Sequence, residues 1–404
     1  MTTAAVTGIG VVAPNGLGVA DYWSAVLRGQ PAIGPIPDST YPVRFAGQVV
    51  GFEPDRHLPG RLVPQTDRMT QFAIAAADWA VQDAKLDLSG FDPLDVGVVT
   101  AGTSGGFSFG QRELANLCHR GPEHVSAYMS FAWFYAVNSG QISIRHDLRG
   151  PTGVLVADQA GGLDALAQAR RKVRQGTRLV LTGGLDCPLC PYSLTAQLAG
   201  GRLSDRDDPA TAYLPFDVRA GGHVPGEGGA ILVLEDRAQA GARGAAVYGE
   251  IAGYGATTDP HPDSGRPPNL RRAIELALAD AGLHPADVAV VFADAAAVPE
   301  LDQAEARALA EVFGPHGVPV TAPKTAIGRI YAGGGPLDVV AALLALRERV
   351  IPPTVNVARR TVDRAVDLVE APRPLTGSAA LVLARGVGGF NSALVVSTRD
   401  IVDR

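Results

Sequence analysis

Short apolar runs alternate with longer amphipathic segments along the whole chain. Apolar runs of strand length predict buried strands at residues 4–12 (a strand pair broken at Gly8 and Gly10), 95–101, 179–182, 248–254, 288–293, 318–322, 378–384 and 393–397. Helical spacing of apolar residues predicts helices at 21–27, 270–281, 299–313 and 335–346, and one more that Thr66 or Asp67 caps. This alternation is typical of an α/β fold.

Two stretches interrupt the alternation. Residues 31–64 are rich in Pro and Gly, which predicts a surface loop. Residues 237–246 are rich in Ala, Arg and Gly and are interpreted as a connector between two sets of elements.

The segment 150–170 has the pattern of a strand, a sharp turn and a helix. We expect a short buried strand at 154–156, a turn at Asp158 and Gln159, and a helix from Leu163 after small residues. Many enzymes present a nucleophile on such an elbow, facing a helix N-terminus. Here the elbow carries Gln159, whose carboxamide is not a nucleophile and does not titrate.

The elbow sequence has an internal echo near the C-terminus. Residues 160–169 read AGGLDALAQA and residues 332–343 read AGGGPLDVVAAL, so Asp164 and Asp338 occupy matching places after a glycine turn. With strand–helix alternation on both sides, the echo predicts two similar α/β halves packed together, with buried central helices.

Composition excludes several function classes. The 404 residues are 46 % hydrophobic and carry a net charge of −6 without a Lys/Arg block, which argues against nucleic-acid or membrane-surface binding. No apolar run is long enough to span a membrane, and the first residues lack the pattern of a signal peptide, so we expect a cytoplasmic protein. Cys187 and Cys190 have no second pair or nearby His pair, so we expect two unrelated thiols and no metal.

Four motifs in the order of the chain resemble those of β-ketoacyl synthases, a family with the thiolase fold. They are VTGIGVVAPNG at 6–16, PFDVRAGGHVPGEGGA at 215–230, APKTAIGRIYAGGGPLDVV at 322–340 and GVGGFNSALV at 386–395. The elbow sequence ADQAGGLDA is most similar to the chain length factor of bacterial type II aromatic polyketide synthases. The resemblance implies two duplicated α/β halves, here 1–243 and 244–404, in a layered αβαβα arrangement.

The resemblance also shows which catalytic positions differ. Gln159 stands at the place of the acylated Cys, and Asp294 and Arg329 stand at the places of two His. Lys324 is retained, and we expect it to pair with Asp294 or Glu227. Val387 replaces a Phe in the C-terminal glycine-rich gate, and the rest of that motif is kept at Gly386, Gly388, Gly389 and Asn391.

These replacements predict a subunit without condensing activity. Claisen condensation needs a thiolate and donors that stabilise an enolate. Gln159 cannot be acylated, Asp294 would add negative charge, and Arg329 does not exchange protons. No residue is therefore assigned to condensation.

The resemblance implies a role in setting product length. A chain length factor pairs with a catalytic ketosynthase as a heterodimer and shapes the tunnel in which the polyketide grows. The matching wall residues are Phe107, Gly110 and Leu114, which share one helix face, with Trp133 beside them; the small Gly110 is expected to open the cavity. An acyl carrier protein would deliver substrate on its phosphopantetheine, and no further cofactor is expected.

Several alternatives stay open at this point. Gln159 could assist decarboxylation of a malonyl thioester, or only fill the space of the missing thiol and bond to its neighbours. An independent acyltransferase would use Ser104 or Cys118. The aromatic run in 130–144 could pack in the core or form a subunit interface.

Overall fold

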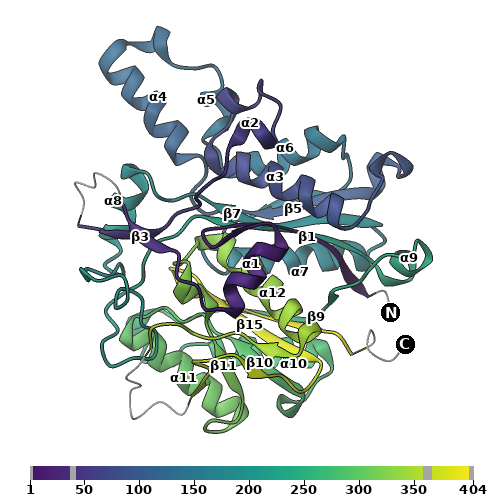
Figure 1. Cartoon of the computed structure of the whole chain (residues 1–404), viewed down its shortest axis with the longest axis vertical. Coiled ribbons are helices and arrows are strands. Elements are labelled where there is room, and N and C mark those ends of the chain that lie inside the picture. The colour runs from purple at the N-terminus through teal and green to yellow at the C-terminus, as the bar shows by residue number, and fades with distance from the viewer. Residues whose placement is uncertain (1–2, 37–41, 358–365, 400–404) are drawn as a thin grey trace.

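A computed structural model describes residues 3–36, 42–357 and 366–399 of the chain. Figure 1 shows two stacked sheets with helices between them and on both outer faces. Five strands from each half form the sheets. The first set is β1 (Ala4–Ala13), β5 (Val96–Ala101), β6 (Thr152–Leu155), β7 (Leu179–Asp186) and β8 (Gly228–Asp236); the second is β9 (Gly249–Thr258), β10 (Val288–Phe292), β11 (Pro319–Thr321), β15 (Ala379–Arg385) and β16 (Phe390–Ser397).

Both sets have the same strand order. The first runs β6-β5-β7-β8-β1 and the second β11-β10-β15-β16-β9, so each places its third strand at the outer edge and its first strand at the inner edge. The sets meet where β1 pairs with β9, through Ala5 opposite Glu250 and Val6 opposite Gly249. Six further strands are short. β2 (Gly16–Leu17) pairs with β1 and β13 (Asp367–Leu368) with β11, whereas β3 (Ile33–Pro35) with β4 (Phe45–Gly47), and β12 (Val350–Ile351) with β14 (Arg373–Pro374), form two separate two-stranded sheets.

The helices form three layers around these strands. The helices α7 (Gly161–Arg174) and α12 (Tyr331–Glu348) lie in the middle and pack on strands of both sets. The outer layers contain α3 (Arg68–Asp83) and α6 (Val137–His146) on one side and α10 (Leu270–Ala281) and α11 (Pro299–Phe313) on the other. The remaining helices are α1 (Val19–Leu27), α2 (Pro54–His57), α4 (Phe107–Arg120), α5 (Met129–Ala132), α8 (Pro191–Ala199) and α9 (Arg237–Ala242). The layers are those of a thiolase-like αβαβα fold, as predicted.

The internal echo marks the contact between the two central helices. A β-carbon at Gly162 of α7 would lie 2.2 Å from the carbonyl oxygen of Ala332 and 2.5 Å from Cδ of Pro336 on α12. Small residues open both helices because their backbones approach this closely. Nearly all of α12 is buried, as expected for a helix that is apolar on all sides.

Several predicted elements have different bounds. β1 is one continuous strand with an irregularity between Val6 and Gly8, because its glycines let α3 pack close to the backbone. β7 continues through Gly183 and Gly184 to Asp186, and α7 begins at Gly161. The elbow strand is half-buried because β6 is a sheet edge, and Val156 beyond it is 50 % exposed.

Other differences concern loops and one helix. The predicted loop at 31–64 contains β3, β4 and α2, and the connector at 237–246 contains α9. α12 is longer than predicted because it begins at Tyr331 and ends at Glu348; Pro336 lies inside the helix, where it removes the hydrogen bond to the Ala332 carbonyl. The bounds of α10 and α11 are as predicted.

We expect Gly162→Ala to lower the free energy of unfolding by at least the roughly 1–3 kcal/mol typical of overpacking, because the new methyl group meets backbone on α12. The matched control is Gly140→Ala in α6, where a β-carbon meets nothing within 4 Å. That variant should be stabilised by about 0.5–1 kcal/mol. Urea denaturation measures both; equal effects would contradict the close contact of the central helices.

Candidate functional site

The elbow connects β6 to α7 and is closed by the C-terminal glycine-rich loop. Asp158 adopts a left-handed conformation (φ 52°), and its Oδ2 accepts a hydrogen bond from the Val387 backbone N–H at 2.7 Å. A β-carbon at Gly386 would lie 2.5 Å from the Ala157 carbonyl oxygen. The gate loop therefore rests directly on the elbow.

The retained residues of that loop keep its shape. Gly388 and Gly389 have φ values of 93° and 87°, which favour glycine. The Asn391 side chain donates to Asp259 Oδ1 at 2.7 Å and to the Gly389 carbonyl at 3.2 Å. Gly388, Gly389 and Asn391 therefore hold the shape of the loop, and this role does not depend on a Cys at the elbow.

The Gln159 side chain is buried at 8 % exposure and lines a small cavity. Asp294, Lys324 and Arg329 line the same cavity, whose volume of about 10 Å³ is close to the minimum for one water molecule. Within the described part of the chain, the Gln159 carboxamide makes no hydrogen bond. Gln159 thus fills the elbow without bonding to its neighbours, contrary to one of the interpretations from sequence.

Asp294 and Arg329 form a buried ion pair. Arg329 Nη2 lies 2.7 Å from Asp294 Oδ1, and Nη1 donates to the Asp294 carbonyl at 2.7 Å. Nη2 also donates to the Arg385 carbonyl at 3.0 Å, and the Arg385 N–H donates to Asp294 Oδ1 at 2.8 Å. The negative charge expected of Asp294 is present, and the positive charge of Arg329 balances it.

The surrounding charges keep this pair ionised. Burial raises the pKa of the Asp294 carboxyl, but the nearby cations Arg329, Lys324 and Arg385 outweigh burial and hold that pKa below its usual value. Burial lowers the pKa of the Arg329 guanidinium, and Asp294 more than reverses this, so the net shift is upward. Neither group is available to exchange protons near neutral pH.

Lys324 pairs with Asp338, which corrects the prediction of Asp294 or Glu227. Its Nζ lies 2.6 Å from Asp338 Oδ2 and donates to the carbonyls of Ala293 at 2.6 Å and Asp294 at 3.3 Å. Glu227 instead pairs with Arg68 at 2.9 Å. The ammonium thus has one carboxylate and two carbonyls around it, so Lys324 joins α12 to the loop after β10.

Two buried acids of α11, which sequence reasoning missed, hold the loop that carries Asp294. Glu305 accepts hydrogen bonds from the backbone N–H of Asp294 at 2.7 Å and of Ala295 at 2.9 Å. Asp302 accepts from the N–H of Ala297 at 3.0 Å. Acids three residues apart on the next helix were the available signal.

The predicted tunnel residues lie together on a projecting part of the molecule. Figure 1 shows α4 and α5 extending from the body above α3. Gly110 is buried, and a β-carbon there would lie 3.4 Å from Trp133 Cβ, an ordinary van der Waals contact, so Trp133 lies directly beside Gly110. Leu114 is 50 % and Trp133 46 % exposed. Phe107 stacks edge-on with Tyr192 at 5.0 Å.

The aromatic run after α5 faces outward, with Trp133, Phe134 and Tyr135 among the exposed large side chains. Only Phe131 of this run packs against a buried cluster. Core packing therefore does not account for the run.

In the part of the chain that the structure describes, the other candidate nucleophiles form no Ser–His or Cys–His hydrogen bond. The Ser104 hydroxyl donates to Asp186 Oδ1 at 3.0 Å, and Cys118 is an exposed free thiol on α4. Cys187 and Cys190 are also free, and burial raises the pKa of the Cys187 thiol well above its usual value. In the residues that the structure describes, no cluster of His, Cys, Asp and Glu has three members that could hold a metal, and no helix is long and apolar enough to cross a membrane.

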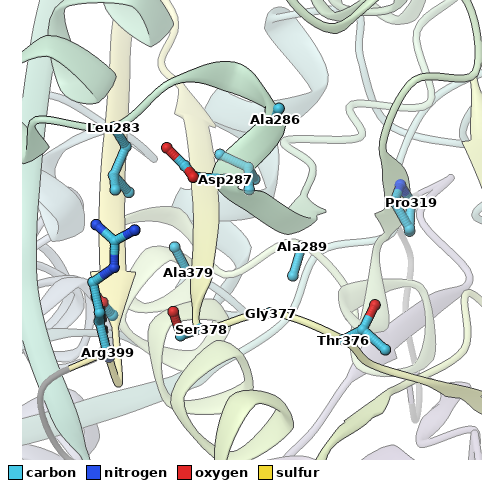
Figure 2. Close-up of a pocket in the computed structure, with 12 residues that line it drawn as sticks. Leu283, Ala286, Asp287, Ala289, Pro319, Thr376, Gly377, Ser378, Ala379 and Arg399 are labelled. Atoms are coloured by element: carbon cyan, nitrogen blue, oxygen red, sulfur yellow. Dashed lines mark hydrogen bonds between the residues drawn. The ribbon is translucent and has the colours of Figure 1, made fainter.

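A larger cavity lies at the opposite ends of the same strands (Figure 2). It has a volume of about 420 Å³ and lies where β10 and β15 begin, with Asp287, Ser378 and Arg399 among its lining residues. Asp294 and Arg385 lie where these strands end. This cavity therefore shares no residue with the elbow site.

We expect Arg329→Met to lower the free energy of unfolding by about 3–5 kcal/mol, because it leaves Asp294 buried without its partner. Adding Asp294→Leu should recover most of the loss. The control is Arg271→Met, which breaks exposed pairs with Glu275 and Glu311 and should leave the free energy of unfolding nearly unchanged. Urea denaturation of the three variants measures this; equal losses for Arg329→Met and Arg271→Met would count against a coupled buried pair.

Comparisons with known proteins agree with this geometry. The N-terminal domain model of beta-ketoacyl synthase matches residues 1–240 and the C-terminal domain model matches residues 248–358. Actinorhodin polyketide putative beta-ketoacyl synthase 2 of Streptomyces coelicolor is 60% identical over 396 residues, covering 97% of each chain. Tetracenomycin polyketide synthase ketoacyl synthase beta subunit of Streptomyces glaucescens is 57% identical over 397 residues, again covering 97% of each.

Solved structures of similar fold include two ketosynthase assemblies. The ishigamide ketosynthase/chain length factor matches with a TM-score of 0.89 at 26% identity, covering 98% of this chain and 99% of that chain. A type II PKS acyl-carrier protein in complex with its ketosynthase bound to the hexaketide (AntDE:AntF) matches with a TM-score of 0.87 at 28% identity and the same coverage. The chain therefore belongs to the β-ketoacyl synthase family.

Proposed function

We propose that this chain is a non-condensing chain length factor that pairs with a catalytic ketosynthase in aromatic polyketide biosynthesis. The observation that carries the proposal is the closed elbow cavity, in which Gln159 faces the positions of the Asp294–Arg329 ion pair. Its relatives at more than half identity are second or beta subunits of polyketide ketoacyl synthases.

The elbow lacks each group that condensation requires. It has no thiolate, and the Arg329 donors with described contacts point to Asp294 and to the Arg385 carbonyl rather than to a substrate oxygen. The cavity is too small for an acyl chain. Condensation is therefore assigned to the partner subunit.

One edge of the molecule suits a partner of the same family. In the described chain, β6 pairs with β5 on one side and with no strand on the other, which leaves backbone donors and acceptors free. Large apolar side chains are exposed in the segments that precede and follow β6 in the chain: Trp133, Phe134, Tyr135 and Val156. Trp, Tyr and Phe are enriched at interfaces. A heterodimer with the catalytic ketosynthase would cover this surface.

The exposed face of α4 would then form part of the tunnel wall. Leu114 and Trp133 present bulky apolar side chains, and Gly110 lets Trp133 lie against α4. A growing chain that meets this wall cannot extend further, because overpacking is unfavourable. Substrate would arrive on the phosphopantetheine of an acyl carrier protein, so this subunit needs no cofactor of its own.

A second candidate role is assistance in malonyl decarboxylation by Gln159. The unpartnered carboxamide favours it, because a free donor next to a helix N-terminus stabilises a developing enolate. Entry of a malonyl thioester requires the closed cavity to open.

We expect Trp133→Ala, made in the complex with the partner ketosynthase, to lengthen most of the polyketide product, because it removes the largest side chain of the wall. Leu114→Trp should shorten it. The control is Leu94→Ala. Leu94 is an exposed apolar residue in the short turn before β5, outside α4 and α5. Mass spectrometry of the products measures length; unchanged length in both wall variants would refute the tunnel role.

We expect Gln159→Ala to keep the product length of the native complex, since the wall is intact. If Gln159 assists decarboxylation, the same variant releases CO₂ from malonyl-loaded carrier protein about 10²–10³-fold more slowly, the usual effect of losing one oxyanion donor. Gln159→Glu, similar in size but without the amide donor, separates loss of the donor from loss of volume. Unchanged CO₂ release in both variants would leave Gln159 a space-filling residue.

A further inference from the structure

We infer that two buried carboxylates outside the tunnel wall, Asp67 and Asp186, are positioning residues that fix α4 and thereby the chain-length wall. The inference rests on the proposed function, because it concerns the helix that carries the wall. The turn between these carboxylates, residues 102–106, connects β5 to α4.

Asp67 joins the starts of two helices. Its Oδ1 accepts a hydrogen bond from the Met69 N–H at 2.9 Å and so caps α3. Its Oδ2 accepts from the N–H of Phe109, in the first turn of α4, at 2.7 Å. The residue is 3 % exposed, so water does not compete for these bonds. One carboxylate therefore sets the position of α4 relative to α3.

Asp186 holds the other end of the same turn. It lies at the end of β7 and is fully buried. Its carboxylate accepts from the backbone N–H of Thr103 at 3.0 Å and of Ser104 at 3.1 Å, and from the Ser104 hydroxyl at 3.0 Å. It also accepts from the Ala332 N–H at the start of α12 at 3.0 Å. The turn is thus tied to the central layer.

The backbone between the two carboxylates contacts the Trp133 segment. The Gly106 N–H donates to the Trp133 carbonyl at 3.0 Å. A β-carbon at Gly106 would lie 2.0 Å from the Ala132 carbonyl and 2.9 Å from Asp67 Cβ. A displacement of this turn therefore moves α4 and Trp133 together.

α4 has few other attachments to the body. Its buried residues are only Phe109, Gly110 and Glu113, and its main packing partners are the short helices α5 and α8 and the turn at 122–124 rather than a sheet. Without a core-facing stripe, the helix depends on its first turn for its place. This is why the two carboxylates, and not packing alone, are assigned the positioning role.

The test compares Asp67→Ser with Asp236→Ser in the complex with the partner ketosynthase. Serine is also a good helix cap, so Asp67→Ser keeps the cap of α3 and loses only the reach to α4. Asp236 caps α9 in the same way, through the Gln239 N–H, far from α4 in sequence and structure. We measure amide hydrogen exchange by mass spectrometry and the distribution of product lengths.

The expected result is at least tenfold faster exchange in the first turns of α4, unchanged exchange in α3, and a broader product distribution; Asp236→Ser changes none of these. Native exchange in α4 of Asp67→Ser would overturn the inference. If Trp133→Ala alters product length, faster exchange in Asp67→Ser together with native products would also overturn the inference. If neither Asp67→Ser nor Trp133→Ala alters the products, the proposed wall function fails instead, even where α4 exchange is faster.

Discussion

The structure around the elbow depends on the buried Asp294–Arg329 ion pair. A charge removed from water is costly unless it is paired and hydrogen-bonded. Arg329 pairs with the Asp294 carboxylate and also donates to the carbonyls of Asp294 and Arg385, and the carboxylate accepts from the Arg385 N–H. Glu305 holds the backbone of Asp294, and Lys324 connects the same loop to Asp338 on α12. The loop after β10, the end of β15 and the central helix are therefore joined through one charged cluster.

This cluster explains how the fold of a condensing enzyme can persist without its chemistry. In the position of two histidines the chain has groups that satisfy one another, and in the position of the thiol it has a neutral amide. The gate loop still rests on the elbow through Asp158 and Val387, so the scaffold that a partner would contact is kept. A buried ion pair is weak evidence for stability by itself, but the loss of one partner leaves the other charge buried and unpaired.

The sequence predicted the parts of this picture that depend on pattern. Periodicity placed α10 and α11, the echo between Asp164 and Asp338 indicated the duplicated halves, and the motifs identified the family. The pattern alone did not predict element ends that depend on tertiary contacts. Gly183 and Gly184 mark the end of a strand in isolation, but β7 continues through them because β5 and β8 pair on both sides.

Long-range partners were the least predictable feature. Lys324 was assigned to the wrong carboxylate because the choice between acids depends on which helix packs against its loop, and Asp338 is the acid on that helix. Asp302 and Glu305 were missed because their partners are backbone N–H groups, so that their spacing of three residues on one helix was the only signal.

The most direct test of the central claim is the intact mass of each subunit after the complex is incubated with an acyl-loaded carrier protein. The account predicts an acyl mass increase on the partner ketosynthase and none on this chain, including in a Gln159→Cys variant when the Asp294–Arg329 pair is kept. An acyl adduct on the native chain would contradict the account.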